Sequence, residues 1–175
     1  MILQIINLIT DMLSIRRAGE EDIERITDIY NDAILTTTAT FDTEIKTLDN
    51  RMQWFFERDD NFPVLVAEKD KTIVGYAALN KWSERKAYNV TAEISLYVHP
   101  NFRGMGIGKF LISEIVKTAQ DSTNLNSLIA RISEGNEHSI YLHRLHNFEL
   151  MGVMKQAGFK FGKLHNVTFM QKMLR

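Results

Sequence analysis

The sequence predicts an α+β domain built on a central, mixed, mostly antiparallel twisted sheet that is flanked by helices. Two observations carry this prediction. Three extended runs rich in Val, Ile, Leu, Tyr and Ala follow one another in the middle of the chain, which indicates an antiparallel meander. A glycine-rich turn, an amphipathic helix and another strand come next, which indicates one parallel, right-handed crossover.

The composition of the chain fits one globular domain. It has 175 residues, 45% of them hydrophobic and 25% charged, as is usual for globular chains. The formal net charge of -1 gives no excess of positive charge for nucleic acid, which is not expected as a partner. Cysteine is absent, which excludes disulfides, thiolate metal sites and cysteine nucleophiles and fits a reducing, cytoplasmic compartment.

Residues 1–13 are interpreted as an apolar N-terminal extension that precedes a single domain over residues 14–175. The extension has no preceding Lys or Arg and is too short to cross a bilayer of about 30 Å, so neither a signal peptide nor a membrane anchor is expected. Two alternatives stay open: Met12 is the functional start, or the segment is a helix that packs on a partner.

The first third of the chain predicts one short strand and two helices around a loop. The strand covers residues 14–17. Apolar residues recur at spacings of three and four over residues 20–34 and 49–58, which predicts two helices. The polar, Thr-rich stretch 36–47 is predicted as a loop, and its isolated Phe41 is of the kind that often lines a pocket.

The middle of the chain predicts strands at residues 63–68, 72–79 and 91–98. Only three residues separate the first two, which suits a tight hairpin turn. Pro100 cannot donate a hydrogen bond to a sheet, so the third strand is expected to end near His99.

The last third predicts two more helices and two more strands. A helical apolar stripe runs through residues 106–119, and a second helix is expected over 136–146. Residues 127–132 and 168–174 are predicted as strands.

A glycine-rich turn is the strongest motif in the chain. Gly104, Gly106 and Gly108 fall within five residues between a strand and a helix. Without side chains, the backbone N–H groups can converge on an anion at the helix N-terminus, where the helix dipole also favours negative charge. Arg103 and Lys109 add cations, so a phosphate or pyrophosphate site is expected.

The spacing of this turn excludes two common phosphate loops. A Walker A loop needs Ser or Thr after its lysine, where this chain has Phe110. A dinucleotide fingerprint needs a third glycine at the position of Lys109.

The run Arg103-Gly104-Met105-Gly106-Ile107-Gly108-Lys109, after a strand that ends Ser95-Leu96-Tyr97-Val98, resembles the coenzyme A pyrophosphate loop of the GNAT superfamily of N-acetyltransferases. The resemblance implies the GNAT (acyl-CoA N-acyltransferase) fold, acetyl-CoA as co-substrate and no metal. It also implies a set of cofactor-binding residues: Leu96, Tyr97, Val98, Arg103, Gly104, Met105, Gly106, Ile107, Gly108, Lys109, Asn136 and Ser139.

Further matches narrow the resemblance. Asn136, Ser139, Leu142 and Phe148 fit the next helix of the superfamily, with His143 in place of the usual Tyr and Asn147 in place of Gly. The remaining matches are Trp82-x-x-Arg85-x-Ala87-Tyr88, Glu93 in T-x-E-x-S-x-Y-V, and Gly158 to Gly162 with His165. Together they are similar to the phosphinothricin N-acetyltransferase family over about residues 14–174.

Glu93 and His143 are the predicted catalytic residues. Glu93 lies in an otherwise apolar strand, where it either faces solvent or is held beside a pocket as a base for the amine. The resemblance favours the base, and it assigns His143 as proton donor to the leaving sulfur or as a second member of a proton relay. A metal on His143 and His146 lacks a third ligand. Without cysteine, direct attack within a ternary complex is expected.

On the acceptor side, Arg85 is the predicted partner for a substrate carboxylate because guanidinium groups bind carboxylates at two points. Its charged neighbours equally fit a solvated loop. Phe41, Trp82 and Tyr88 are predicted as apolar walls of the acceptor site, with a place in the core as the alternative.

The predicted function is therefore acetyl-CoA-dependent N-acetylation of the α-amine of a small amino acid or analogue, of the phosphinothricin or methionine sulfone or sulfoximine type. The alternatives are acetylation of another amine, such as a protein N-terminus or a polyamine, and a non-catalytic module that binds coenzyme A. The resemblance also implies a homodimer. Neither nucleic acid nor a membrane is expected as a partner, as the charge balance and the short apolar extension indicate.

Overall fold

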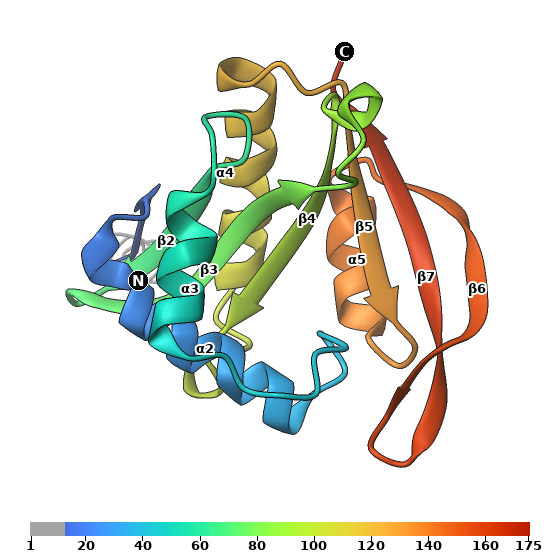
Figure 1. Cartoon of the computed structure of the whole chain (residues 1–175), viewed down its shortest axis with the longest axis horizontal. Helices are drawn as coiled ribbons and strands as arrows, with labels where there is room; N and C mark the ends of the chain where they lie inside the picture. The colour runs from blue at the N-terminus through green and yellow to red at the C-terminus, as the bar shows by residue number, and fades with distance from the viewer. Residues whose placement is uncertain (1–12) are drawn as a thin grey trace, which may run out of the picture.

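A computed structural model describes residues 13–175, and these form one seven-stranded sheet with helices on both faces (Figure 1). The strand order across the sheet is β1-β2-β3-β4-β5-β7-β6. The strands are β1 (Leu13–Arg17), β2 (Val64–Lys69), β3 (Thr72–Lys81), β4 (Thr91–Val98), β5 (Ser127–Ser133), β6 (Glu149–Lys160) and β7 (Lys163–Met173). The predicted extension lies outside the described residues except for Leu13, which begins β1.

Four helices cover the sheet: α2 (Ile23–Thr36), α3 (Leu48–Phe56), α4 (Ile107–Ser122) and α5 (Glu137–Leu145). Three short 3-10 turns, η1 (Glu20–Asp22), η2 (Lys86–Tyr88) and η3 (Pro100–Phe102), complete the connections. α2 and α3 lie on one face of the sheet, and α4 and α5 lie on the other (Figure 1). The four predicted helices are confirmed, with ends that differ by one to three residues.

The core consists of two apolar clusters, one on each face of the sheet. On one face, Ile107, Leu111 and Ile115 of α4 pack with Leu65 and Ala67 of β2. On the other face, the helix residues Ile23, Ile26 and Ile29 pack with the strand residues Val64, Val66 and Tyr76. Successive residues of β2 thus face opposite layers, which explains why its sequence is apolar without alternation.

The only parallel pair among the described strands is β4 with β5, as the crossover predicted. Its register joins Thr91 to Ser127, Ala92 to Leu128 and Glu93 to Ile129. No pairing continues past Glu93, and the two strands diverge from there (Figure 1). The carboxyl half of β4 therefore has a neighbouring strand on the β3 side alone.

The long β6–β7 hairpin corrects the sequence prediction, which placed only a terminal strand at residues 168–174. The register of β6 shifts between Leu150 and Gly152 and again between Met154 and Gly158, and Gln156 takes a left-handed φ of 52°. These bulges interrupt the period of two by which a strand is recognised in a sequence.

Candidate active site

The glycine turn forms an open cradle at the start of α4. Gly104 and Gly106 have left-handed φ angles of 76° and 80°, which glycine adopts without strain. Gly106 is the N-cap of this 16-residue helix, and no side chain caps it. A Cβ on Gly104 would meet nothing within 4 Å, so the space beside the turn is free for a ligand. This arrangement suits an anion held by backbone N–H groups at a helix N-terminus.

A cavity of about 850 Å³ lies beside this turn, between the carboxyl end of β4, α4 and α5. Eleven of the twelve predicted cofactor residues line it: Leu96, Tyr97, Val98, Arg103, Gly104, Gly106, Ile107, Gly108, Lys109, Asn136 and Ser139. Met105 does not line it, and its side chain is 43% exposed. The structure thus brings two separate sequence motifs to one cavity, hereafter the coenzyme cavity.

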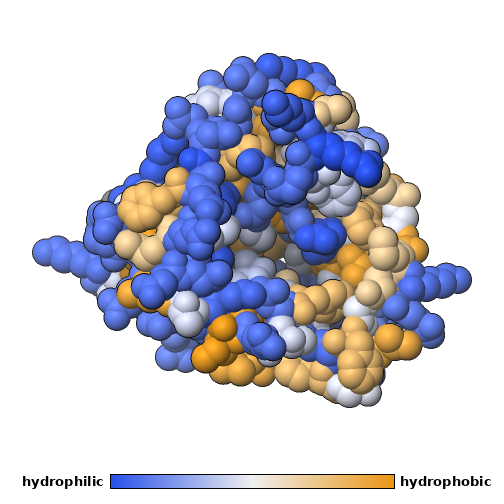
Figure 2. All heavy atoms as spheres, viewed as in Figure 1, coloured by the Kyte–Doolittle hydropathy of each residue, from blue (hydrophilic) through white to orange (hydrophobic). Residues whose placement is uncertain are grey.

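A second cavity, hereafter the acceptor cavity, has a volume of about 770 Å³ and is lined by residues of α2, α3, β3, β4, β5 and β7. The pleat of β4 directs Glu93, Ser95 and Tyr97 toward it. The two cavities share Thr38, Ala39 and Tyr97, so they meet at the end of β4. Figure 2 shows the surface hollowed near the centre of this face.

Glu93 is held in the acceptor cavity by Arg131 of β5. The Arg131 Nε atom donates to Glu93 Oε1 at 2.7 Å, and Nη2 donates to Oε2 at 2.5 Å. The sequence left open whether Glu93 faces solvent or lies beside a pocket. Its side chain is 17% exposed and lines the acceptor cavity, so it lies beside a pocket. The paired hydrogen bonds fix the orientation of the carboxylate plane.

Arg131 was missed by the sequence analysis, although one signal was present. It is the only charged residue in β5, just as Glu93 is the only one in β4. A single acidic residue and a single basic residue in neighbouring apolar strands suggest an ion pair. Only the register of the two strands shows that the two side chains lie on the same face of the sheet.

His143 is buried in α5, with 3% of its surface exposed, and it lines neither cavity. Its Nδ1 lies 2.8 Å from the Ser139 carbonyl oxygen. A carbonyl only accepts, so Nδ1 carries the proton and Nε2 is a bare acceptor. Burial lowers the pKa of His143 to about 4, so the ring is neutral at pH 7. This tautomer does not supply the proton that the resemblance assigned to the leaving sulfur.

The predicted acceptor residues are only partly brought together. Phe41 lines the acceptor cavity, whereas Trp82, Arg85 and Tyr88 line neither cavity. Trp82 packs edge-on against Phe169, at 6.3 Å between ring centres. Arg85 is exposed at the start of η2, in the loop that joins β3 to β4 at the end away from the coenzyme cavity. The solvated-loop alternative for Arg85 thus describes its place in this chain.

Three tyrosines form one wall of the acceptor cavity. The ring of Tyr97 lies 5.2 Å from that of Tyr30 and 5.3 Å from that of Tyr76. Burial raises the pKa of Tyr30 to about 12 and raises the pKa values of Tyr76 and Tyr97 well above the usual value of a tyrosine. The three hydroxyls therefore stay protonated at neutral pH and can donate hydrogen bonds. Tyr30 donates to Asp42 Oδ2 at 2.8 Å.

Residues 37–42 form a loop that contributes to both cavities, and β6 fastens it. The buried Lys160 Nζ donates to the carbonyl oxygens of Thr37 and Thr40, both at 2.8 Å. Phe41 lies so close to Gly158 that a Cβ there would come within 2.3 Å of its ring. The wall between the two cavities thus depends on the β6–β7 hairpin.

The part of the chain that the structure describes contains no group of three or more acidic or histidine side chains placed to hold a metal ion. Within residues 13–175, no helix is long and apolar enough to cross a bilayer.

The sequence of residues 25–148 matches the model of the acetyltransferase (GNAT) family. Among known proteins, the chain is 37% identical to the L-amino acid N-acyltransferase MnaT of Escherichia coli, covering 93% of this chain and 94% of that protein. It is 36% identical to the L-methionine sulfoximine/L-methionine sulfone acetyltransferase of Salmonella typhimurium, covering 93% of this chain and 95% of that protein. It is 31% identical to the phosphinothricin N-acetyltransferase of Streptomyces coelicolor, covering 94% of this chain and 98% of that protein.

The fold has a solved counterpart that contains the expected co-substrate. The structure of yncA from Salmonella typhimurium with its cofactor acetyl-CoA superposes with a TM-score of 0.90. The two chains are 36% identical, and the match covers 94% of this chain and 95% of that one.

Proposed function

The chain belongs to the acetyltransferase (GNAT) family, and on that premise we propose that it acetylates the α-amine of a small amino acid or analogue, with acetyl-CoA as donor. One observation carries the proposal: two cavities meet at the end of β4, one beside the glycine turn and the other around Glu93. The amino-acid acceptor rests on the relatives, which are named for acetylating amino acids, methionine sulfoximine or sulfone, and phosphinothricin.

The residues of the coenzyme cavity fit acetyl-CoA. Backbone N–H groups at the start of α4, with Arg103 and Lys109, face the pyrophosphate. The edge of β4 that has no neighbouring strand runs past the same cavity, where its backbone at Leu96 to Val98 can pair with the amide groups of the pantetheine arm. The acetyl group then lies where the two cavities meet, beside Tyr97.

The reaction forms a C–N bond to the acceptor and breaks the C–S bond of the thioester. The amine loses a proton, and the departing sulfur gains one. Glu93 accepts the amine proton, directly or through water, and Arg131 keeps the carboxylate aimed into the acceptor cavity. The chain contains no cysteine that could carry the acetyl group as a thioester. The amine therefore attacks acetyl-CoA directly within a ternary complex, and no acetyl-enzyme forms.

His143 is retained as a second member of the proton relay. Its Nε2 is buried and has no hydrogen-bond partner within residues 13–175. Because its pKa is about 4, this nitrogen would hold a proton only transiently and pass it on, which is the behaviour of a relay member and not of a final proton acceptor.

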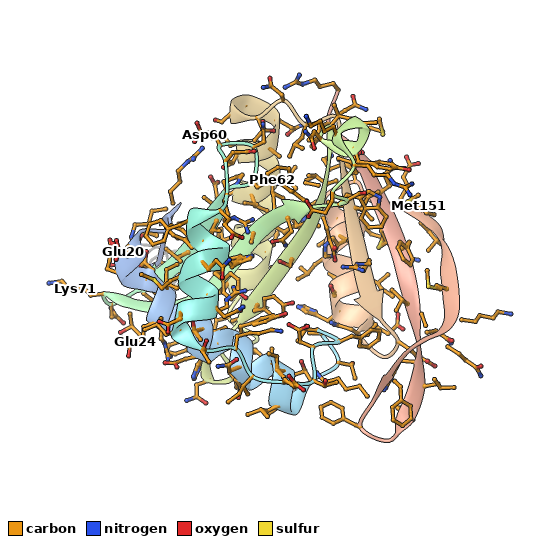
Figure 3. The ribbon with its side chains drawn as sticks, viewed as in Figure 1. Glu20, Glu24, Asp60, Phe62, Lys71 and Met151 are labelled. Carbon is orange, nitrogen blue, oxygen red and sulfur yellow. The ribbon has the colours of Figure 1, made fainter. Side chains whose placement is uncertain are left out.

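We further propose a homodimer that works in the cytoplasm, where acetyl-CoA is available. Support for the dimer is the outer strand β6, which pairs with β7 and with no other described strand, and which exposes Leu150, Met151, Val153 and Met154 by more than half. Met151 points outward at the edge of the sheet (Figure 3). A long, exposed, apolar edge strand is a ready template for pairing with another chain.

The function is tested by following thiol release from acetyl-CoA with a panel of acceptors. Phosphinothricin, methionine sulfone and methionine sulfoximine are expected to give saturable rates, and a polyamine and an N-terminal peptide only background. Preference for the polyamine or the peptide would contradict the amino-acid proposal. Heat of acetyl-CoA binding without turnover of any acceptor would instead indicate a non-catalytic module.

A further inference from the structure

Arg51 is a buried cation that points into the acceptor cavity without a counterion. It lies on α3 with 6% of its surface exposed. Its guanidinium stacks 3.6 Å from the ring centre of Trp54 and 4.8 Å from that of Tyr30. Nε is buried without a hydrogen-bond partner, and no carboxylate of the described chain forms a salt bridge with Arg51.

The two acids that line the acceptor cavity are each paired with a basic side chain of the protein. Asp42, the acid on the same wall, binds Lys46 at 3.0 Å and accepts from Tyr30. Glu93, on β4, is paired with Arg131. Arg51 is near enough to Asp42 to contribute to the lowering of the pKa of that carboxyl, but neither acid forms a salt bridge with Arg51.

A second guanidinium, that of Arg58, stacks on the same tryptophan and, unlike Arg51, has hydrogen-bond acceptors within the protein. Arg58 lies over the Trp54 ring at 4.4 Å and donates from Nε to the Phe62 carbonyl at 2.7 Å and from Nη2 to the Leu79 carbonyl. It lines a different cavity. Arg58 therefore has a structural explanation that Arg51 lacks.

A buried ion without a partner is strongly unfavourable, so a site of this kind normally takes a ligand of opposite charge. Stacking on an aromatic face also fixes the plane of a guanidinium, which presents its N–H edge for two-point contact with a carboxylate. The acceptor of the proposed reaction is an amino acid, which bears such a carboxylate beside its amine.

We propose that Arg51 binds the carboxylate of the acceptor amino acid while Glu93 faces its amine. The proposal rests on the proposed function and moves carboxylate recognition from the exposed Arg85 to a residue inside the cavity. Two different elements that line the cavity, α3 and β4, then hold the two opposite charges of the substrate.

The test compares one amino acid with its carboxamide in the wild type, Arg51→Gln and Arg51→Lys. Arg51→Gln is expected to raise KM for the acid about 30-fold, as for loss of one charged hydrogen-bonded pair. KM for the carboxamide and the dissociation constant of acetyl-CoA are expected to stay within about twofold. Arg51→Lys keeps the buried charge but loses the planar fork, so an intermediate loss confined to the acid is expected.

Arg58→Gln is the matched control, since it removes a guanidinium from the other contact with Trp54. It is expected to lower the melting temperature and to change the rates with acid and carboxamide by equal factors. Equal losses with both acceptors in both Arg51 variants would overturn the proposal and leave the enzyme's function standing. If the wild type acetylates no amino acid, the proposed function itself fails. If Arg51→Gln does not fold, the ratio of KM for the acid to KM for the carboxamide in Arg51→Lys tests the proposal instead.

Discussion

Glu93 and Arg131, each the single charge of an apolar strand, pair with one another in the acceptor cavity. The turn motif and the T-x-E-x-S-x-Y-V strand could be recognised in the sequence because each is a contiguous pattern. Arg51 left no such pattern, and Arg131 left only a single charge in an apolar strand, because the roles of both depend on which residues the fold brings to them. Contacts between residues 38 positions apart leave no local pattern in a single sequence.

Glu93→Gln keeps the shape and polarity of the side chain but removes the base. Turnover is expected to fall about 100-fold or more, the usual contribution of a general base. The dissociation constant of acetyl-CoA, measured by calorimetry, is expected to change by less than about twofold because Glu93 does not line the coenzyme cavity. Glu149→Gln, at an exposed position of β6, is the control. Equal turnover in all three proteins would remove Glu93 from the mechanism.

His143 gives the fold a specific sensitivity to acid. Its pKa is about 4 in the folded protein and 6.5 in the unfolded chain, so between these values only the unfolded chain binds the proton. The free energy of unfolding therefore falls as the pH drops from 6.5 to 4, by about 3 kcal/mol from this group. Above pH 6.5 both states are neutral, and the contribution is constant.

Urea unfolding of the wild type and His143→Gln at pH 7 and pH 4.5 measures this contribution. The variant is expected to lose less stability between the two pH values than the wild type does. His138→Gln, which changes an exposed histidine, is expected to follow the wild type. A parallel loss in His143→Gln and the wild type would show that other groups account for the acid sensitivity.

At the scale of elements, two glycines with similar backbone conformations allow the effect of backbone strain to be distinguished from the effect of ligand contact at the start of α4. Gly104 and Gly162 have nearly the same left-handed φ, 76° and 75°, and an added Cβ meets nothing within 4 Å at either position. Alanine is expected to cost about 1 kcal/mol of stability at each site. Only Gly104→Ala, whose Cβ enters the coenzyme cavity, is expected to raise the dissociation constant of acetyl-CoA, by about tenfold or more.

Thermal unfolding and calorimetry on both alanine variants check this pair of outcomes. Equal acetyl-CoA affinity in Gly104→Ala and Gly162→Ala would mean that the turn does not touch the coenzyme.

The β6–β7 hairpin supports the 37–42 loop through one buried lysine. Replacing Lys160 with Met removes both of its hydrogen bonds to the loop carbonyls and is expected to lower the free energy of unfolding by about 1–3 kcal/mol. Faster hydrogen exchange is expected within residues 37–42 and not in α4. Lys155→Met, at an exposed position of the same strand, is the control. Unchanged exchange in the loop would show that Lys160 does not fasten it.

Elements with regular periodicity were predictable, and irregular ones were not. The β2–β3 hairpin was recognised from its spacing, and its turn residues Asp70 and Lys71 indeed take left-handed φ angles of 50° and 61°. The β6 strand went unrecognised because its bulges shift the faces on which apolar residues fall. The strand that fastens the site is thus the one that propensity alone does not find.

For the whole molecule, the exposed edge of β6 is the surface on which the dimer proposal depends. Met151 is 57% exposed there, and a charge at this position is expected to weaken association of two chains. Met151→Glu should shift sedimentation from dimer to monomer at micromolar concentration. Leu35→Glu, on α2 at 62% exposure, is the matched control and should leave the mass unchanged. A monomeric wild type would contradict the dimer.

At this scale the sequence predicted the order of strands and helices apart from β6, but not where the sheet opens. The β4–β5 pairing stops after Glu93 although both strands continue with apolar residues. Behind the two strands, α4 contacts β4 and α5 contacts β5. Contacts between layers of this kind leave no pattern within either strand sequence.

The small overlap between the two cavities has a consequence for the order in which the reactants bind. Among the described residues, the cavities share Thr38, Ala39 and Tyr97 and differ in all the other residues that line them. Under the proposed function, we expect donor and acceptor to bind in either order because each has a cavity of its own. The protein could then hold acetyl-CoA before an acceptor arrives.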